Sequence, residues 1–132
     1  MPIRPVAIGL VLCELIIVDE KTRNVTTASC FSRRIVEGAV ALMPPFYVVA
    51  TMVNGHGAMP AKLVIERLDT LEITYERAFT LSFADSLQEV AGIFRLRGNV
   101  IPVHGFYQAL LIVDGEVIAQ KRFSIIPKET KP

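Results

Sequence analysis

The chain has 132 residues, a formal net charge of +1 and no concentrated block of basic residues. A chain of this length folds as one domain with a real hydrophobic core, without needing disulfides or metal ions. The lack of a basic patch argues against nucleic-acid binding. Hydrophobic residues make up 52% and charged residues 20%, an apolar excess that predicts strands apolar on both faces or a surface covered by a partner.

The first predicted element is a strand at 5–18, rich in Val, Ile and Leu. Its apolar run is shorter than the roughly 20 residues that cross a membrane. The segment before Cys13 faintly resembles a lipoprotein cleavage box, but Leu12 stands where a small residue is needed. We therefore expect a cytoplasmic protein with no membrane span and keep an envelope-associated module as the alternative.

A polar turn at 19–24 leads to a second predicted strand at 25–32. If the loop consists of residues 20–23, residue 18 pairs with residue 25, and Cys13 lies directly opposite Cys30. One face of this hairpin is the more apolar, and we expect it to face the core. It carries Val11, Cys13, Leu15, Ile17, Ala28 and Cys30.

Residues 33–45 are predicted to be a connection, because Gly38 and Pro44-Pro45 interrupt regular structure. Segment 84–89 has the Ser-x-x-Glu spacing of a capping box, for which we expect a loop or at most one helical turn. The intervening and following strands are predicted at 46–53, 61–68, 71–83 and 90–96, with turns at 54–57, 69–70 and 97–99.

The C-terminal segment 102–126 predicts a hairpin around Asp114-Gly115, a strong signal for a type I′ turn. A two-residue loop pairs Val113 with Glu116 and turns Tyr107 away from the core. A three-residue loop with a bulge at Gly115 turns Tyr107 inward. Both registers leave an apolar outer face, which is a further candidate interface with a partner. The hairpin closes a domain at 1–126, and residues 127–132 are predicted to be a disordered polar tail.

About eight short strands and no helical periodicity predict an all-β fold, an antiparallel β-sandwich. Gly105-x-Tyr107 at the start of the penultimate strand resembles the end of an immunoglobulin-like or fibronectin-like domain. That resemblance implies a structural corner in which the Tyr107 hydroxyl bonds upstream backbone. The chain departs from the immunoglobulin pattern because it has no Trp and its Cys spacing does not suit an inter-sheet disulfide.

Further segments resemble a family of small bacterial proteins of about this length. They are 13–18, the turn Asp-Glu-Lys-Thr-Arg-Asn-Val at 19–25, 44–50 and Phe83-x-Asp85. The resemblance spans nearly the whole chain, but its motifs are structural. It implies a β-sandwich and carries over no catalytic or binding residue.

Cys13 and Cys30 are the candidate redox pair, and the alternative is that both are reduced, buried thiols. A zinc site needs about four ligands, and the only histidines are His56 and His104, so we expect no metal and no cofactor. No phosphate-binding loop or nucleophile elbow is present.

The leading hypothesis is a non-enzymatic binding or scaffold module that self-associates, first as a dimer, through strands 6–18 or 46–53. The alternative is a small-ligand site or an enzyme active site at one end of the sandwich. That alternative requires His56 and His104 to converge.

Overall fold

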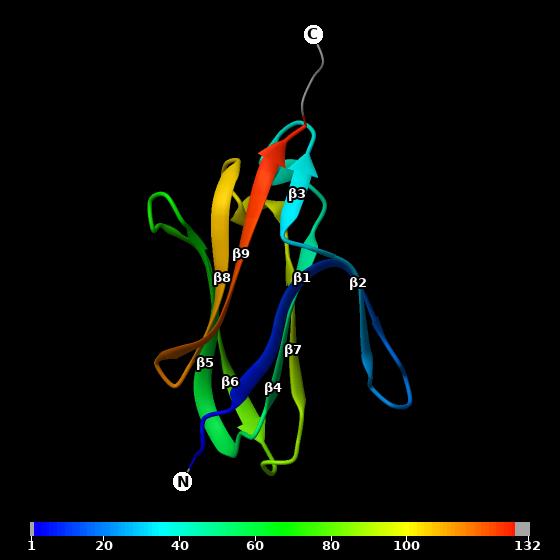
Figure 1. Ribbon diagram of the computed structural model, residues 1–132, viewed down its shortest axis with the longest axis vertical. Helices are drawn as coiled ribbons and strands as arrows, with labels where there is room; N and C mark the ends of the chain where they lie inside the picture. The colour runs from blue at the N-terminus through cyan, green and yellow to red at the C-terminus, as the bar shows by residue number, and fades with distance from the viewer. Residues whose placement is uncertain (1, 129–132) are drawn as a thin grey trace.

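The computed structural model describes residues 2–128 and is all-β, as predicted (Figure 1). Two 3-10 turns, η1 (Val40–Leu42) and η2 (Gly98–Val100), lie between strands, and neither is long enough to cross a membrane. The strands are β1 (Val6–Val18), β2 (Val25–Phe31), β3 (Arg33–Val36), β4 (Phe46–Val53), β5 (Gly57–Arg67), β6 (Ile73–Phe83), β7 (Val90–Leu96), β8 (Gly105–Val113) and β9 (Glu116–Pro127).

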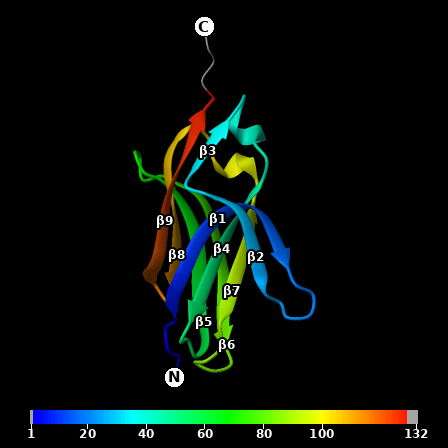
Figure 2. The same cartoon turned by 45° about the vertical axis from the view of Figure 1, so that its right-hand side comes forward.

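The strands form two sheets packed against each other, with orders β2-β1-β4-β7 and β3-β9-β8-β5-β6 (Figures 1 and 2). All neighbouring pairs are antiparallel except β3 and β9, which run parallel. The expected connection at 33–45 is therefore wrong in its first part. Arg34 and Val36 alternate inward with a strand period, but their partner is the last strand of the chain, which local sequence patterns do not reveal.

Inner-face side chains of both sheets meet in the core. At one end Phe46 of β4 packs against Phe123 of β9, with ring centroids 6.2 Å apart, and Tyr107 stacks on Phe123 at 5.7 Å. A second buried cluster fills the other end around Met52, Met59, Leu81, Phe83 and Leu111. Aromatic contacts at these separations add to the free energy of area burial.

The predicted strands at 46–53 and 90–96 have the observed bounds. β5 begins earlier than predicted and includes Pro60, which pairs with Thr80 of β6. On its other side β5 pairs with β8, which ends at Val113, opposite Ala61. Position 60 therefore has no partner strand on that side, and a proline, which has no N–H to donate, is tolerated there. Segment 84–89 is a loop, in which Gln88 Oε1 accepts from the Ala84 N–H at 2.7 Å.

The register predicted for the first hairpin is confirmed, with Val18 opposite Val25 and Cys13 opposite Cys30. Its predicted core face is confirmed at Cys13, which is fully buried, and is wrong for the rest of the hairpin beyond it. Leu12, on the other face, is fully buried in the core, whereas Leu15 is 52% and Ile17 55% exposed. β1 pairs with β4 only as far as Cys13, so the residues beyond it lie outside the sandwich core.

In the terminal hairpin Val113 pairs with Glu116, so the loop has two residues. Asp114 and Gly115 both have positive φ, 50° and 82°, as a type I′ turn requires. Neither register considered from the sequence is right over the whole hairpin, because the pairing shifts within it.

The shift is a bulge further along β9. Leu111 pairs with Ala119 while Ile112 pairs with Val117, which leaves Ile118 as the extra residue. The bulge reverses the facing of β9 between Val117 and Ala119, whereas β8 alternates without a break. Val117 is therefore 52% exposed rather than in the core, and Phe123 faces inward opposite the fully buried Tyr107. The bulge was expected at Gly115 and lies three residues later.

The domain continues beyond the predicted boundary at 126. Pro127 pairs with Val36, and the Lys128 N–H donates to the Val36 carbonyl at 3.1 Å. The beginning of the predicted disordered tail is therefore ordered by β3. Residues 129–132 lie outside the described part of the chain.

Candidate functional site

The β1–β2 hairpin stands away from the rest of the molecule in both views of the fold (Figures 1 and 2). We call residues 14–29, beyond the last pairing of β1 with β4, the arm. Within it β1 pairs only with β2, and β2 is an edge strand of its sheet. Ser29 has φ of 56° between the pairs at Cys30 and Ala28, and such a residue in a strand marks a local distortion of the backbone.

The tip of the arm is held by its own side chains. Asp19 Oδ1 accepts from the backbone N–H of Lys21 at 2.9 Å and of Thr22 at 2.8 Å. These hydrogen bonds hold the pKa of Asp19 below its ordinary value. Arg23 takes the left-handed position, φ 63°, and its N–H donates to the Asp19 carbonyl at 2.9 Å. The turn is thus ordered without a glycine.

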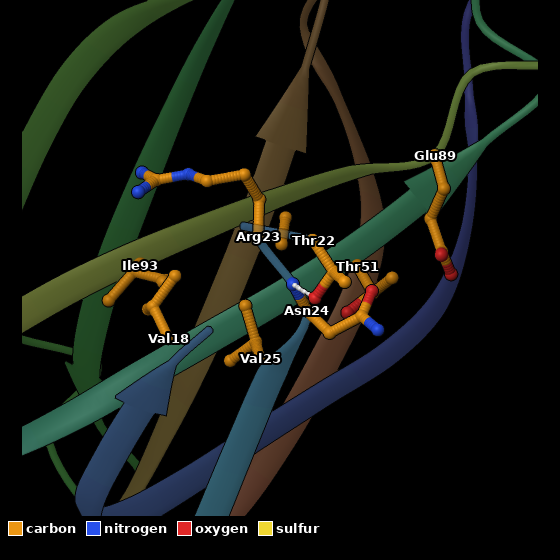
Figure 3. Close-up of a pocket in the computed structure, with 9 residues that line it drawn as sticks. Val18, Thr22, Arg23, Asn24, Val25, Thr51, Glu89 and Ile93 are labelled. Carbon is orange, nitrogen blue, oxygen red and sulfur yellow. Dashed lines mark hydrogen bonds between the residues drawn. The ribbon is translucent and has the colours of Figure 1, made fainter. Parts of the chain in front are cut away.

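A groove of about 620 Å³ lies between the arm tip and the outer face of β4 and β7 (Figure 3). Val18 and Val25 of the arm form one wall, and Thr51 and Ile93 belong to the other. Polar residues of the tip, with Glu89 before β7, complete the lining. One face of the arm is therefore turned toward the sheet.

The opposite face of the arm is apolar and open to solvent. Leu15 pairs with Ala28 and Ile17 pairs with Thr26, and directly paired residues share a face. We call these four residues the outer face of the arm. Its two large side chains are more than half exposed.

Arg34 of β3 anchors the base of the arm. Its guanidinium lies 3.4 Å from the Glu14 carboxylate and donates to the Pro44 carbonyl at 2.8 Å. The same group lies over the rings of Phe31 and Phe46, at 5.4 and 5.9 Å. The pKa of Arg34 is lowered overall, because the effect of burial exceeds the opposing effect of the nearby Glu14 carboxylate. Glu14 is thus a partly exposed ion-pair partner.

Cys13 and Cys30 are paired across β1 and β2 at this base, and both are free thiols. Cys13 is fully buried, whereas Cys30 is exposed, so the reading of both as buried thiols is wrong for Cys30. Burial, with a contribution from Cys30, raises the pKa of the Cys13 thiol. The Cys30 thiol lies 3.4 Å from the Thr27 hydroxyl.

The two histidines do not converge. His56 is exposed and pairs with Ile3 near the N-terminus, next to the start of β5. His104 precedes β8, whose first residues pair with the end of β5. A strand of this length spans roughly 30 Å, so the two imidazoles lie at opposite ends of the molecule. A site that joins them is excluded.

The remaining residues singled out from the sequence have structural surroundings. The Tyr107 hydroxyl donates to the Val103 carbonyl at 2.7 Å and accepts from its N–H at 3.4 Å. The pKa of this phenol is raised, and burial is the largest cause. Gly105 has φ of 151°, and Asp114 and Gly115 form the hairpin turn.

The sequence did not identify the arm, its groove or the role of Arg34. The turn residues and alternation at 13–30 were visible, but they did not show that the pairing with β4 stops at Cys13. Within residues 2–128 no group of three or more His, Cys, Asp or Glu is placed to hold a metal ion.

No family model matches the chain, and no curated protein does. Among solved structures, a β-glucosidase from Listeria innocua in complex with glucose aligns with 76% of this chain at 9% identity and a TM-score of 0.48. The chain spans only 15% of that enzyme's length. The sensor domain of the anti-sigma factor RsgI4 from Pseudobacteroides cellulosolvens aligns over 94% of this chain and 96% of its own length, at 11% identity and a TM-score of 0.42.

Proposed function

We propose that this protein is a non-enzymatic binding module that self-associates through the outer face of its arm. One observation carries the proposal: Leu15 and Ile17 are 52% and 55% exposed on a hairpin that stands apart from the core. Apolar burial contributes about 25 cal/mol per Å². An interface that removes this face from water therefore stabilises a dimer relative to two monomers.

The arm is also a poor structure to leave alone in water. An isolated two-stranded hairpin is marginally stable, and the arm has no strand beyond β2 at its edge. A second copy of the chain offers the same apolar face and the same free edge. A two-fold axis through the arm would pair these surfaces with themselves, as isologous dimers do. We therefore commit to a second copy as the partner.

Sedimentation velocity over a range of micromolar concentrations tests this proposal. We expect a concentration-dependent shift from the monomer toward the dimer in the native protein. The double variant Leu15→Asp, Ile17→Asp should remain a monomer and keep its native circular dichroism. Phe106→Asp is the matched control, because Phe106 is 66% exposed on another strand. A native protein that stays monomeric throughout would overturn the proposal.

The finer fold assignment also belongs to this proposal. We infer immunoglobulin-like topology, supported by the two sheet orders and by the Tyr107–Val103 hydrogen bond at the start of β8. We infer a cytoplasmic location from the sequence of the first strand. Lipoprotein cleavage before Cys13 would remove Leu12 from the core and its pairing with Val48. The intact mass of the mature protein tests that alternative.

A further inference from the structure

We propose that Cys13 and Cys30 form an oxidisable dithiol, which a small-molecule disulfide such as oxidised glutathione converts to an intramolecular bridge at the base of the arm. This inference does not depend on self-association. It rests on the pairing of the two residues and on the different access to each thiol.

The backbone places the two residues within reach of a bond. They are direct partners across the β1–β2 pair, and directly opposed residues have Cα atoms about 4.5–5.5 Å apart. Disulfides form across Cα separations of about 4.4–6.8 Å. Their Cβ atoms must approach somewhat more closely than in an ordinary cross-strand pair. The distorted residue Ser29 adjoins Cys30, at the point where such an adjustment is needed.

The two thiols differ in access, and this sets the order of events. Cys30 is exposed and lines a hollow of about 200 Å³ with Phe31, Ser32 and Lys121. The ammonium group of Lys121 favours the approach of an anionic oxidant. Cys13 is fully buried, so a bulky disulfide cannot reach it first. Cys30 is therefore the attacking thiol and Cys13 the resolving one.

The reaction balances in two exchanges. The Cys30 thiolate attacks one sulfur of oxidised glutathione, which forms a mixed disulfide and releases one glutathione thiolate. Cys13 then loses its proton to water, and its thiolate attacks the Cys30 sulfur and releases the second glutathione. Two protein thiols are oxidised, and one glutathione disulfide is reduced to two thiols. The Cys30 charge that opposes ionisation of Cys13 is absent in the mixed disulfide, which favours the second step.

A bridge at this position joins the two strands where the arm meets the sheet. It limits how far the arm can open at Ser29 and fixes the arm over the groove. The dithiol is thus a modification site that reports, and responds to, the thiol–disulfide balance of its surroundings.

The test is titration of the 132-residue chain, dilute and monomeric, with glutathione buffers, followed by intact mass spectrometry and peptide mapping. We expect the native protein to lose two hydrogen atoms, in a Cys13–Cys30 linked peptide. The ratio of bridged to reduced protein should change about tenfold for each ~30 mV of buffer potential.

Two variants distinguish the steps. Cys13→Ala should stop at one glutathione on Cys30, and Cys30→Ser should remain unmodified because Cys13 is buried. Circular dichroism of each variant checks that it is folded. The Cys30→Ser result relies only on an exposed position, so it stays informative if Cys13→Ala is unstable. A native protein that accumulates the mixed disulfide without closing the bridge, or that resists oxidation altogether, would overturn the proposal.

Discussion

The two hairpins of this protein share a sequence pattern but have different surroundings. Both combine a polar turn with apolar, partly alternating strands, and both follow the hydrogen-bonding pattern of antiparallel pairs. In the β8–β9 hairpin Tyr107, Leu111 and Phe123 are buried against the other sheet. In the arm Leu15 and Ile17 face solvent. Alternation therefore predicts which residues share a face, but not whether anything covers that face.

The largest expected difference between the hairpins is in the cost of truncating a leucine. Leu111→Ala should lower the free energy of unfolding by about 2–5 kcal/mol, because the side chain is fully buried. Leu15→Ala, in dilute protein, should change it by no more than about 0.5 kcal/mol. Urea denaturation of the two variants measures both. Equal losses would mean that the arm packs as part of the core.

The anchor of the arm should have an intermediate effect. Arg34→Ala removes the hydrogen bond to the Pro44 carbonyl and the contacts with Phe31 and Phe46. We expect it to destabilise the protein by about 2 kcal/mol. Arg33→Ala is the control, because Arg33 is the adjacent arginine and its side chain is exposed. Thermal melts of the two variants compare them, and an unchanged melting temperature for Arg34→Ala would show that the anchor contributes nothing.

Removing the Tyr107 hydroxyl, at the start of the terminal hairpin, should lower the free energy of unfolding by a smaller amount. Tyr107→Phe loses the hydrogen bond to Val103 and should cost about 1 kcal/mol. Tyr47→Phe, on a half-buried position of β4, is the control.

The pKa of Tyr107 and that of Cys13 are both raised by burial. The folded protein therefore keeps protons that the unfolded chain releases in alkaline solution. Stability should fall as the pH rises past the ordinary pKa values of these groups. The free energy of unfolding of Tyr107→Phe should fall less steeply than that of the native protein, as measured by urea denaturation from neutral pH to about pH 11, past the ordinary pKa of tyrosine. A slope identical to that of the native protein would assign the loss to other groups.

Much of the fold was predictable because it depends on short-range patterns. The strand bounds of β4 and β7 and the register of the arm follow from alternation and turn residues. β3 was missed because its partner is at the other end of the chain, and the core face of β1 was misassigned because Leu12 and Cys13 are both buried. The bulge at Ile118 has no local signal, since no glycine or proline marks it. The two cysteines were paired from the sequence alone, but their unequal exposure depends on tertiary packing.

Hydrogen–deuterium exchange at several protein concentrations tests most directly whether the two hairpins differ only in what covers them. We expect the amides of β8 to be protected at every concentration. The amides of residues 14–29 should exchange fast in dilute protein and slow as the dimer forms. Exchange in the arm that does not change with concentration, while the protein nevertheless associates, would contradict this account and place the interface elsewhere.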